Sequence, residues 1–316
     1  MTSVIPDRTG RSVGPLPGPD ALAAIVRCLV TSLVLIARGS VHDPTGNVGR
    51  AIRFVATGQF RRVWREVHVR IYRFVYEIIW ILVWRGRASP RPQPVAKISL
   101  QTKHPVAFES PDHIAPKGTA ENNSTNKKFI LHMDELLGRE LTRRPLRCLD
   151  LGCSGGQMVK DFLDLKWIAA GLEGSDFSLK HRRANWATLA NTHLFTCDIT
   201  KPFQVFIDSE PAQFDLITSW EVLEHIATPD LNGLFDNIRK HLAHGGYFIA
   251  STTCTPDIHE GIELHQTKWE HHEWRSFVEK NYPDLEFASV GLKIYQYVRY
   301  NFLHPSHLVY RKKALP

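Results

Sequence analysis

The fold class of this chain follows from one segment, Cys148-Leu149-Asp150-Leu151-Gly152-Cys153-Ser154-Gly155-Gly156. An apolar run ends in an acid and opens into a glycine-rich turn. Such a turn lets the backbone approach a ligand closely, because glycine has no Cβ and tolerates a positive φ. Residues 157–163 continue with a pattern typical of a helix. The segment therefore predicts a strand, a tight turn and a helix beside a bound ligand.

The turn does not match the two common phosphate-binding sequences. Ser154 and Gln157 stand where the dinucleotide fingerprint G-x-G-x-x-G needs its second and third glycines, so a nicotinamide or flavin pyrophosphate is not the favoured ligand. The phosphate loop G-x-x-x-x-G-K-[ST] is absent from the sequence as well. What remains resembles the first motif of class I S-adenosylmethionine-dependent methyltransferases, in which Asp-Leu-Gly-Cys-x-x-Gly is a common form.

Further segments follow at the spacing expected of that family. Four more strands are predicted, over residues 167–173, 194–199, 214–220 and 247–251. A helix is predicted over residues 231–242. Strands that alternate with helices and end in acids predict a parallel sheet that binds its ligand at the carboxyl edge. The fourth strand also leads into Glu221-Val222-Leu223-Glu224-His225, which is similar to the EVLEH segment of many small-molecule methyltransferases.

The resemblance implies a Rossmann-like seven-stranded methyltransferase sheet with helices on both faces. We interpret residues 285–290 and 307–311 as the antiparallel strands that complete it. The alternation of strands and helices by itself supports only a parallel α/β domain. We therefore predict a helical arm over residues 1–88, a linker over 89–112 and a class I methyltransferase domain over 113–316.

The same resemblance assigns a cofactor site for S-adenosyl-L-methionine. Glu173, at the end of the second strand, is the candidate for the ribose hydroxyls. Asp198 takes the position that holds the adenine amino group in the family. The predicted cofactor-binding residues are Asp150, Gly152, Cys153, Ser154, Gly156, Glu173, Asp198, Ile199, Trp220 and Glu221.

The predicted catalytic residues are His225, His265 and Glu224. His225 could take a proton from an alcohol or phenol near neutral pH, or it could be a helix-start histidine bonded to backbone. His265 lies in a region that resembles the acceptor-facing segment of sugar and natural-product methyltransferases. By resemblance to ubiquinone-pathway O-methyltransferases, Glu221 and Glu224 could instead orient the acceptor or hold a divalent cation.

No metal site is predicted. The histidine-rich region 259–272 lacks the short Cys or His spacing of a zinc site. The five cysteines also lack C-x-x-C spacing, so reduced thiols are expected rather than a disulfide framework.

The net charge of +7 belongs to the N-terminal region. Residues 1–100 carry 15 basic and 5 acidic side chains, whereas the remainder carries 24 basic and 27 acidic ones. Arginine interleaves there with apolar segments at 21–37 and 59–84, and the second of these is rich in Trp and Tyr. The arm could pack on its own domain or on a second subunit, or lie on an anionic membrane surface. A cleaved signal peptide is disfavoured because Arg27 interrupts the apolar segment. Binding of nucleic acid by the arm is disfavoured because the sequence shows no recognisable nucleic-acid-binding module.

Two segments connect the arm to the first motif. The proline-rich stretch 89–94 predicts an extended, semi-rigid linker. The polar stretch 116–126 could cap a helix over 127–141 through Ser124 or Asn126, or could fold over the cofactor as a lid.

We thus predict an S-adenosylmethionine-dependent O-methyltransferase that acts on a glycan or lipid-linked intermediate. We expect it in the cytoplasm, with peripheral inner-membrane association and oligomerisation through the arm as open alternatives. The alternative from a different class is a noncatalytic cofactor-binding scaffold of a membrane-associated biosynthetic complex. The acceptor, its methylated atom and any need for a metal are not decided by the sequence.

Overall fold

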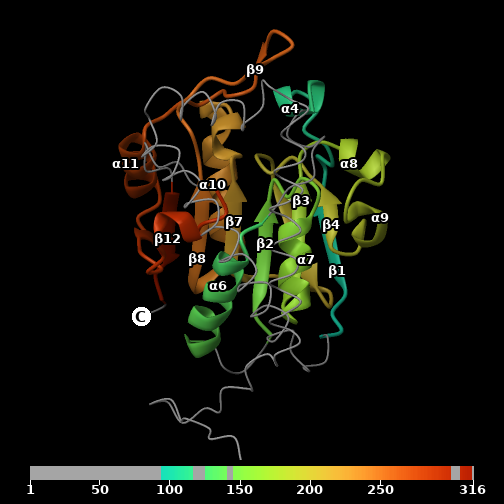
Figure 1. Ribbon diagram of the computed structural model, residues 1–316, viewed down its shortest axis with the longest axis vertical. Helices are drawn as coiled ribbons and strands as arrows, with labels where there is room; N and C mark the ends of the chain where they lie inside the picture. The colour runs from blue at the N-terminus through green and yellow to red at the C-terminus, as the bar shows by residue number, and fades with distance from the viewer. Residues whose placement is uncertain (1–93, 117–124, 141–144, 300–306, 315–316) are drawn as a thin grey trace, which may run out of the picture. The chain divides into compact units, whose positions relative to one another are not determined.

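One seven-stranded sheet carries the predicted strands, in the order β11-β12-β8-β7-β2-β3-β4 (Figure 1). The structure is a computed structural model that describes residues 94–116, 125–140, 145–299 and 307–314 of the 316-residue chain. The strands of the sheet are β2 (Arg147–Leu151), β3 (Ile168–Glu173), β4 (Leu194–Thr196), β7 (Phe214–Trp220), β8 (Leu242–Ser251), β11 (Leu285–Phe287) and β12 (His307–Lys312). The predicted arm lies outside the described residues and stays a prediction.

The central strands are buried on both faces. Every residue of β3 is buried, as are the last four of β2 and the first six of β7. Because side chains alternate along a strand, Cys148 and Ala169 join one apolar core while Leu149 and Ala170 join the other. Such continuous apolar runs are typical of parallel strands covered by helices on both sides.

Helices cover both faces of the sheet, as predicted. Apolar side chains of α6 and α7 belong to one core, and those of α10 and α11 belong to the core on the opposite face (Figure 1). The described helices are α4 (Pro111–Ile114), α6 (Lys127–Glu140), α7 (Gln157–Asp164), α8 (Phe177–Lys180), α9 (Trp186–Leu189), α10 (Leu231–His241) and α11 (His271–Asn281), with short 3-10 turns η1 (Leu223–His225), η2 (Thr228–Asp230) and η3 (Ile294–Gln296). The Rossmann-like architecture is thus observed in the described part of the chain.

The direction of β11 corrects one prediction. β12 pairs antiparallel with both β8 and β11, so β11 runs in the same direction as the parallel strands. Only the second of the two segments predicted as antiparallel strands therefore opposes the parallel set. The reason is the helical crossover through α11, which returns the chain to the edge from which β8 started. Residues 288–290 also lie beyond the end of β11.

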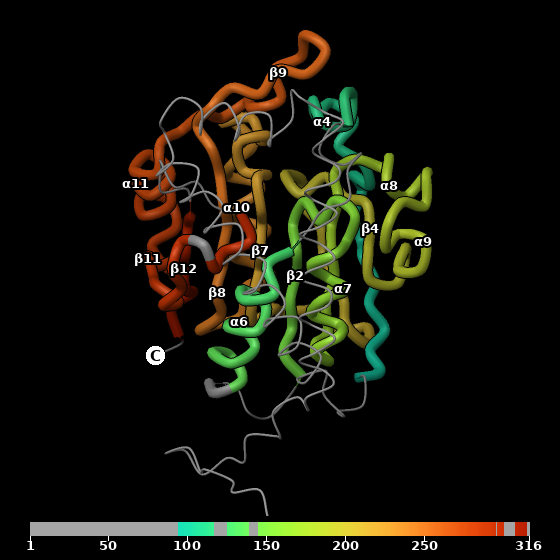
Figure 2. The backbone as a smooth tube through the Cα atoms, in the orientation of Figure 1, coloured from blue at the N-terminus to red at the C-terminus, as the bar shows by residue number. Residues whose placement is uncertain are grey.

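The predicted linker is wrong for its described part, residues 94–112. Strand β1 (Ile98–Thr102) pairs antiparallel with β5 (Phe203–Ile207), which also pairs with β6 (Glu210–Pro211). Ile98 belongs to a core of the catalytic domain, and Leu100 packs against it. The alternation of apolar and polar residues from Ile98 was the signal for a strand, although the prolines before it suggested a spacer. Figure 2 traces this segment along the edge of the domain.

The described residues also bear on membrane-spanning helices and on the predicted lack of disulfides. Among the described residues, no helix is both long and apolar enough to cross a bilayer. The four cysteines in these stretches are free thiols, and Cys148, Cys153 and Cys197 are buried. The expectation of reduced thiols is confirmed for these positions.

His241, at the end of α10, is a buried histidine that must remain neutral. Its Nδ1 donates to the Asn237 carbonyl at 2.9 Å, and its Nε2 accepts the Val205 N–H at 3.2 Å. The ring also stacks on Phe203 with 4.6 Å between centroids. Burial lowers the pKa of His241 to about 4, and the charge of Lys240 acts in the same direction.

This histidine should make folding sensitive to acid. Between its unfolded pKa near 6.5 and its folded pKa near 4, the unfolded chain binds the extra proton, so stability falls as the pH falls. We expect wild-type protein to lose about 3 kcal/mol more unfolding free energy than His241→Gln across this range, from about 1.4 kcal/mol per pKa unit. Urea denaturation followed by tryptophan fluorescence measures this difference. The exposed His244→Gln is the control, and parallel pH curves for wild type and H241Q would contradict the prediction.

Candidate active site

A cavity of about 780 Å³ lies at the carboxyl edge of the sheet, within the range of roughly 300–1,000 Å³ typical of small-molecule sites. The parallel register brings its walls together. Asp150 of β2 lies opposite Gly171 of β3 and Thr218 of β7, so all three strands end at the same edge. The chain continues from β2 to β3 on one side and later adds β7 on the other. This reversal of strand order is the switch point where open α/β sheets bind ligands.

The glycine-rich turn after β2 forms the floor of the cofactor side. Gly152, Ser154 and Gly156 all have positive φ, at 74°, 46° and 78°. Ser154 is held in this conformation from two sides, since its N–H donates to Glu173 Oε2 at 2.6 Å and its carbonyl accepts Trp186 Nε1 at 2.6 Å. Trp186, in the short helix α9, is a supporting residue that no motif in the sequence indicated.

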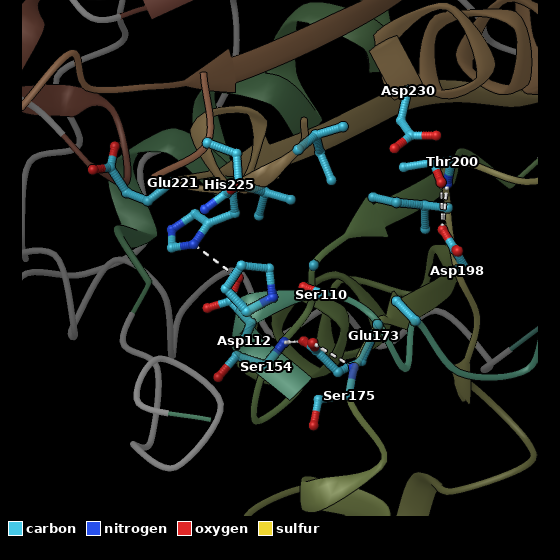
Figure 3. Close-up of a pocket in the computed structure, with 18 of the residues that line it drawn as sticks. Ser110, Asp112, Ser154, Glu173, Ser175, Asp198, Thr200, Glu221, His225 and Asp230 are labelled. Atoms are coloured by element: carbon cyan, nitrogen blue, oxygen red, sulfur yellow. Dashed lines mark hydrogen bonds and ion pairs between the residues drawn. The ribbon is translucent and has the colours of Figure 1, made fainter. Parts of the chain in front are cut away.

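Two buried carboxylates face this turn. Asp150 accepts the Thr218 hydroxyl at 2.7 Å, and burial raises the pKa of Asp150 to about 7. Glu173 lies between the backbone N–H groups of Ser154 and Ser175 (Figure 3). Burial raises the pKa of Glu173 to about 7, although these two N–H donors act against the shift. A ligand that brings positive charge or hydrogen-bond donors would therefore stabilise the ionised form of both acids.

A strap formed by residues 104–112 makes the opposite wall of the cavity, a role that no motif in the sequence indicated. Its first half is tied to the segments that follow β4 and β3, because Asp198 N–H donates to the His104 carbonyl and Ala107 N–H donates to the Gly174 carbonyl, both at 2.9 Å. Asp198 also accepts the N–H and hydroxyl of Thr200 (Figure 3). The strap therefore positions the end of β4 as well as closing the cavity.

Most of the predicted cofactor residues line this cavity. They are Asp150, Gly152, Ser154, Glu173, Asp198, Ile199, Trp220 and Glu221. Cys153 and Gly156 are not among the lining residues. Cys153 is fully buried with its N–H bonded to the Leu172 carbonyl, and a Cβ added at Gly156 would overlap the buried side chain of Leu194. These two residues support the turn from behind.

The polar stretch before α6 is described only at its end. Asn126 Oδ1 accepts the Lys128 N–H at 3.1 Å, so Asn126 caps α6 as one of the two predicted candidates. Thr125 lines the cavity, and its hydroxyl bonds to Asp161 of α7. Residues 117–124, which include Ser124 and most of the hypothetical lid, lie outside the described residues.

The three predicted catalytic residues come together on the acceptor side. Glu224 and His225 lie in η1, and His265 follows strand β10 (Ile262–Glu263) of the hairpin begun by β9 (Ile258–His259). The Glu224 carbonyl accepts the N–H groups of Gln266 at 2.7 Å and Thr267 at 2.9 Å, which holds the His265 loop against η1. The two imidazole centroids are 4.7 Å apart, and one potential ligand atom from each of the three side chains lies within 4.8 Å of the others. His225 lines the cavity itself.

The electrostatics of this cluster involve the strap. His225 Nδ1 lies 2.8 Å from Asp112 Oδ2, so the neutral ring directs its Nδ1 proton at this carboxylate and becomes its ion-pair partner on protonation (Figure 3). Burial lowers the pKa of His225, but the Asp112 partner and nearby acids outweigh burial and leave that pKa raised. Burial raises the pKa of Glu224 to about 8, and the charge of Glu221 adds to the shift. Asp112 is thus a site residue that the predicted linker had concealed.

The residues of the cofactor side fit S-adenosyl-L-methionine. Its ribose hydroxyls, adenine amino group and methionine ammonium are hydrogen-bond donors, and the cavity presents carboxylates at the ends of β2, β3 and β4 to accept them. Residues 125–297 match the model of the methyltransferase domain family. The chain belongs to this methyltransferase family. The predicted fold class, the methyltransferase assignment and the cofactor are therefore confirmed.

Curated relatives of this methyltransferase can be aligned with only part of its chain. A ubiquinone biosynthesis O-methyltransferase of Idiomarina loihiensis is 28% identical over 121 residues, which are 38% of this chain and 45% of the relative. The enzyme of that name from Psychrobacter cryohalolentis is 30% identical over 132 residues, or 40% of this chain and 48% of the relative. The chain spans about half the length of the curated relatives it matches.

Solved structures show weaker overall likeness. An S-adenosylmethionine-dependent methyltransferase from Clostridium acetobutylicum is 15% identical, with a TM-score of 0.43. The match covers 65% of this chain and 96% of that one. The family assignment therefore depends on the match of residues 125–297 to the family model and not on these solved structures.

Gly152 offers a test of the cofactor turn. An alanine Cβ there would overlap a methyl group of Val222, and the positive φ costs any non-glycine residue about 1–2 kcal/mol. We expect Gly152→Ala to weaken S-adenosylhomocysteine binding about tenfold or more, at roughly 1.4 kcal/mol per tenfold. Isothermal titration calorimetry measures the affinity.

Gly138→Ala is the matched control for this prediction, because no atom lies within 4 Å of a Cβ added in α6. It should keep the wild-type affinity. The double variant Gly152→Ala/Val222→Ala should recover only part of the loss, since the overlap disappears while the unfavourable φ remains. Equal affinities for G152A and G138A would show that the turn does not contact the cofactor.

Proposed function

We propose that the protein is an S-adenosylmethionine-dependent O-methyltransferase that acts on a hydroxyl of a small molecule. The observation that carries this proposal is the position of His225. It lines the same cavity as the cofactor-side carboxylates Asp150, Glu173 and Asp198, and its Nδ1 is engaged by Asp112. Nε2 is therefore the nitrogen left to receive the proton of an acceptor hydroxyl. The O-methyltransferase names of the curated relatives favour oxygen as the methylated atom.

The roles of the residues follow from an in-line displacement. When bound, S-adenosyl-L-methionine supplies a methyl group on a sulfonium, whose carbon–sulfur bond electrons stay on sulfur as the new oxygen–carbon bond forms. Glu173 and Asp198 hold the nucleoside, and Asp150 with the turn from Gly152 holds the methionine end. His225 accepts the hydroxyl proton, Asp112 orients its ring, and His265 with Glu224 forms the wall behind it.

For the acceptor class we propose a glycan or lipid-linked biosynthetic intermediate. Two exposed apolar side chains, one on the strap and one just after it, support an acceptor with an apolar part. Phe108, which lines the cavity, is 63% exposed, and Ile114 of α4 is 62% exposed. The arginine-rich arm supports a location at an anionic membrane surface, where such intermediates are held.

The second candidate is a noncatalytic scaffold that binds S-adenosylmethionine and docks a biosynthetic complex through the arm. A measurement of methyl transfer distinguishes the enzyme from the scaffold. A donor with an isotopically labelled methyl group, incubated with purified protein and cell extract, should label a metabolite that mass spectrometry can identify. Cofactor binding without transfer to any extract component would favour the scaffold.

Glu173 offers a direct test of the cofactor side. Hydrogen bonds to a charged group contribute about 1.5–3 kcal/mol, so we expect Glu173→Ala to weaken cofactor binding by roughly 10- to 100-fold. Glu173→Gln, which keeps an acceptor oxygen for the Ser154 N–H, should lose less. Calorimetry with S-adenosylhomocysteine measures both, and Glu210→Gln on the exposed strand β6 is the control. Wild-type affinity in E173A would exclude Glu173 from the cofactor site.

The arm generates a separate prediction. Full-length protein should sediment with vesicles of anionic phospholipid at low salt, and high salt should release it because the Debye length falls to about 3 Å at 1 M. A chain that begins at residue 94, and therefore keeps β1 and the strap, should remain in the supernatant. Failure of the full chain to bind anionic vesicles at low salt would exclude the membrane role and favour packing of the arm on protein.

A further inference from the structure

Positive charge is scarce in the cavity. Among the described residues that line it, acidic side chains outnumber the permanent cations, which are Lys201 and Arg299. Lys201 is engaged, because its Nζ lies 2.8 Å from Asp230 Oδ1 and the hydrogen bond to Asp230 raises the pKa of Lys201. The side chain of Arg299 is exposed, and its guanidinium forms no hydrogen bond or ion pair within the described part of the chain. Arg299 is therefore the cavity cation that remains free for an anionic ligand.

The backbone that carries Arg299 is held in place. The Arg299 carbonyl can only accept, so it receives the Nε2 proton of His307. The His307 ring stacks on Tyr297, with 4.0 Å between the ring centroids. Asn126 Nδ2 donates to the Tyr297 carbonyl at 2.9 Å, which joins this segment to the residue before α6. The guanidinium thus extends from a fixed point, so a ligand that binds it has to order only one side chain.

Trp220, the last residue of β7, brings a second free donor to the same cavity. Its indole Nε1 is shielded from solvent and has no acceptor within the described residues. An indole N–H can only donate, and buried donors in folded proteins are nearly always bonded to an acceptor. An oxygen of a bound ligand would supply the acceptor that Trp220 lacks.

Trp220 and Arg299 lie at the same end of the cavity. Phe129 of α6 packs edge-on against Trp220, with 4.9 Å between the ring centroids. The same Phe129 ring lies 6.3 Å from the ring of Tyr297, two residues before Arg299. One aromatic side chain thus contacts both the end of β7 and the segment that carries the guanidinium.

A second link between the two segments runs through His307. Burial lowers the pKa of His307 and the charge of Glu221 opposes this shift, so Glu221 lies near the ring that holds the Arg299 carbonyl. Glu221 follows Trp220 in the chain, and its Oε1 accepts the Ser251 hydroxyl at 2.6 Å. Within the described residues it forms no ion pair with Arg299. The neighbouring acid therefore leaves the guanidinium available.

We propose that the Arg299 guanidinium and the Trp220 Nε1–H form a binding site for a carboxylate at this end of the cavity. A guanidinium presents parallel N–H groups that match the two oxygens of a carboxylate, and the indole adds one more donor. The other walls of the cavity are acidic, so a carboxylate bound here depends on the charge of Arg299. Trp220 was among the predicted cofactor residues, whereas no motif in the sequence indicated Arg299.

The carboxylate site rests on the function proposed above, because that function names the two molecules that could carry the carboxylate. One source is the methionine part of the cofactor. The other source is an acidic group of the acceptor, and in that case the acceptor class is narrowed to a hydroxylated acid. Its carboxylate would be held by Arg299 while its hydroxyl meets His225, which lines the same cavity. Carboxylate binding is measurable without turnover, so the two proposals can fail independently.

The first arm of the test examines the cofactor. Calorimetry on the full chain compares S-adenosylhomocysteine with its decarboxylated analogue. If the cofactor carboxylate occupies the site, wild type should bind S-adenosylhomocysteine roughly 10- to 100-fold more tightly than the analogue, as expected for hydrogen bonds to a charged group. Arg299→Gln and Trp220→Phe should each remove much of that preference, and Arg299→Lys should keep part of it, since lysine retains the charge without the fork. Unchanged affinity for the analogue verifies that each variant is folded.

The second arm examines the acceptor. Protein saturated with S-adenosylhomocysteine is titrated with 4-hydroxybenzoate or with phenol, which differ by one carboxylate. If an acidic acceptor occupies the site, wild type should bind the hydroxybenzoate roughly tenfold or more tightly than phenol, as for hydrogen bonds to a charged group. Arg299→Gln and Trp220→Phe should reduce this preference while the ratio between S-adenosylhomocysteine and its analogue keeps the wild-type value.

Arg275→Gln and Trp269→Phe are the matched controls, because neither residue lines the cavity and Arg275 pairs with Glu279 on α11. Both should behave as wild type in each arm. The proposal is overturned if wild type shows no carboxylate preference in either arm, or if R299Q or W220F leaves the preference intact. Methyl transfer to an extract component would then leave the O-methyltransferase proposal standing. A carboxylate preference that depends on Arg299, found without any methyl transfer, would count against the O-methyltransferase proposal alone.

Discussion

The parallel register of β2 with β3 and β7 is the constraint on which the site depends. Backbone hydrogen bonds place Asp150 beside Gly171 and Thr218, so the acids that end successive strands arrive at one edge of the sheet. A slip of one residue would turn each of these side chains to the opposite face. The register also brings the Ser154 N–H to within 2.6 Å of the Glu173 carboxylate, which links the turn after β2 to the end of β3.

Burial of carboxylates is the second organising feature of the cavity. Burial raises the pKa of Asp150 and Glu173 to about 7 and that of Glu224 to about 8. Each of these acids is disfavoured as an isolated charge in this environment. The ammonium and sulfonium groups of the cofactor relieve this cost on the cofactor side, because they bring positive charge to buried acids.

Features set by neighbouring residues were predicted correctly from the sequence, whereas features set by contacts between distant segments were missed. The turn at Gly152 and the strands around it were recognisable, because an apolar run, an acid and glycines stand next to one another in the chain. Strand β1 was missed, since its short alternating pattern follows a proline-rich stretch and its partner β5 lies about a hundred residues away. The direction of β11 was wrong because a strand's residue pattern does not record whether the preceding connection is a crossover. Cys153 was assigned to the cofactor, yet its side chain is buried in the core.

The sequence by itself determined the methyl donor, because the donor is bound by local strand–turn–helix segments whose residues are neighbours in the chain. Only the tertiary structure decided the acceptor side. Asp112 reaches His225 from a strap that resembled a linker, and His265 reaches Glu224 through backbone bonds between two loops. No periodicity or motif spacing encodes such contacts, since loop-to-loop hydrogen bonds depend on where the packed sheet places the loop ends.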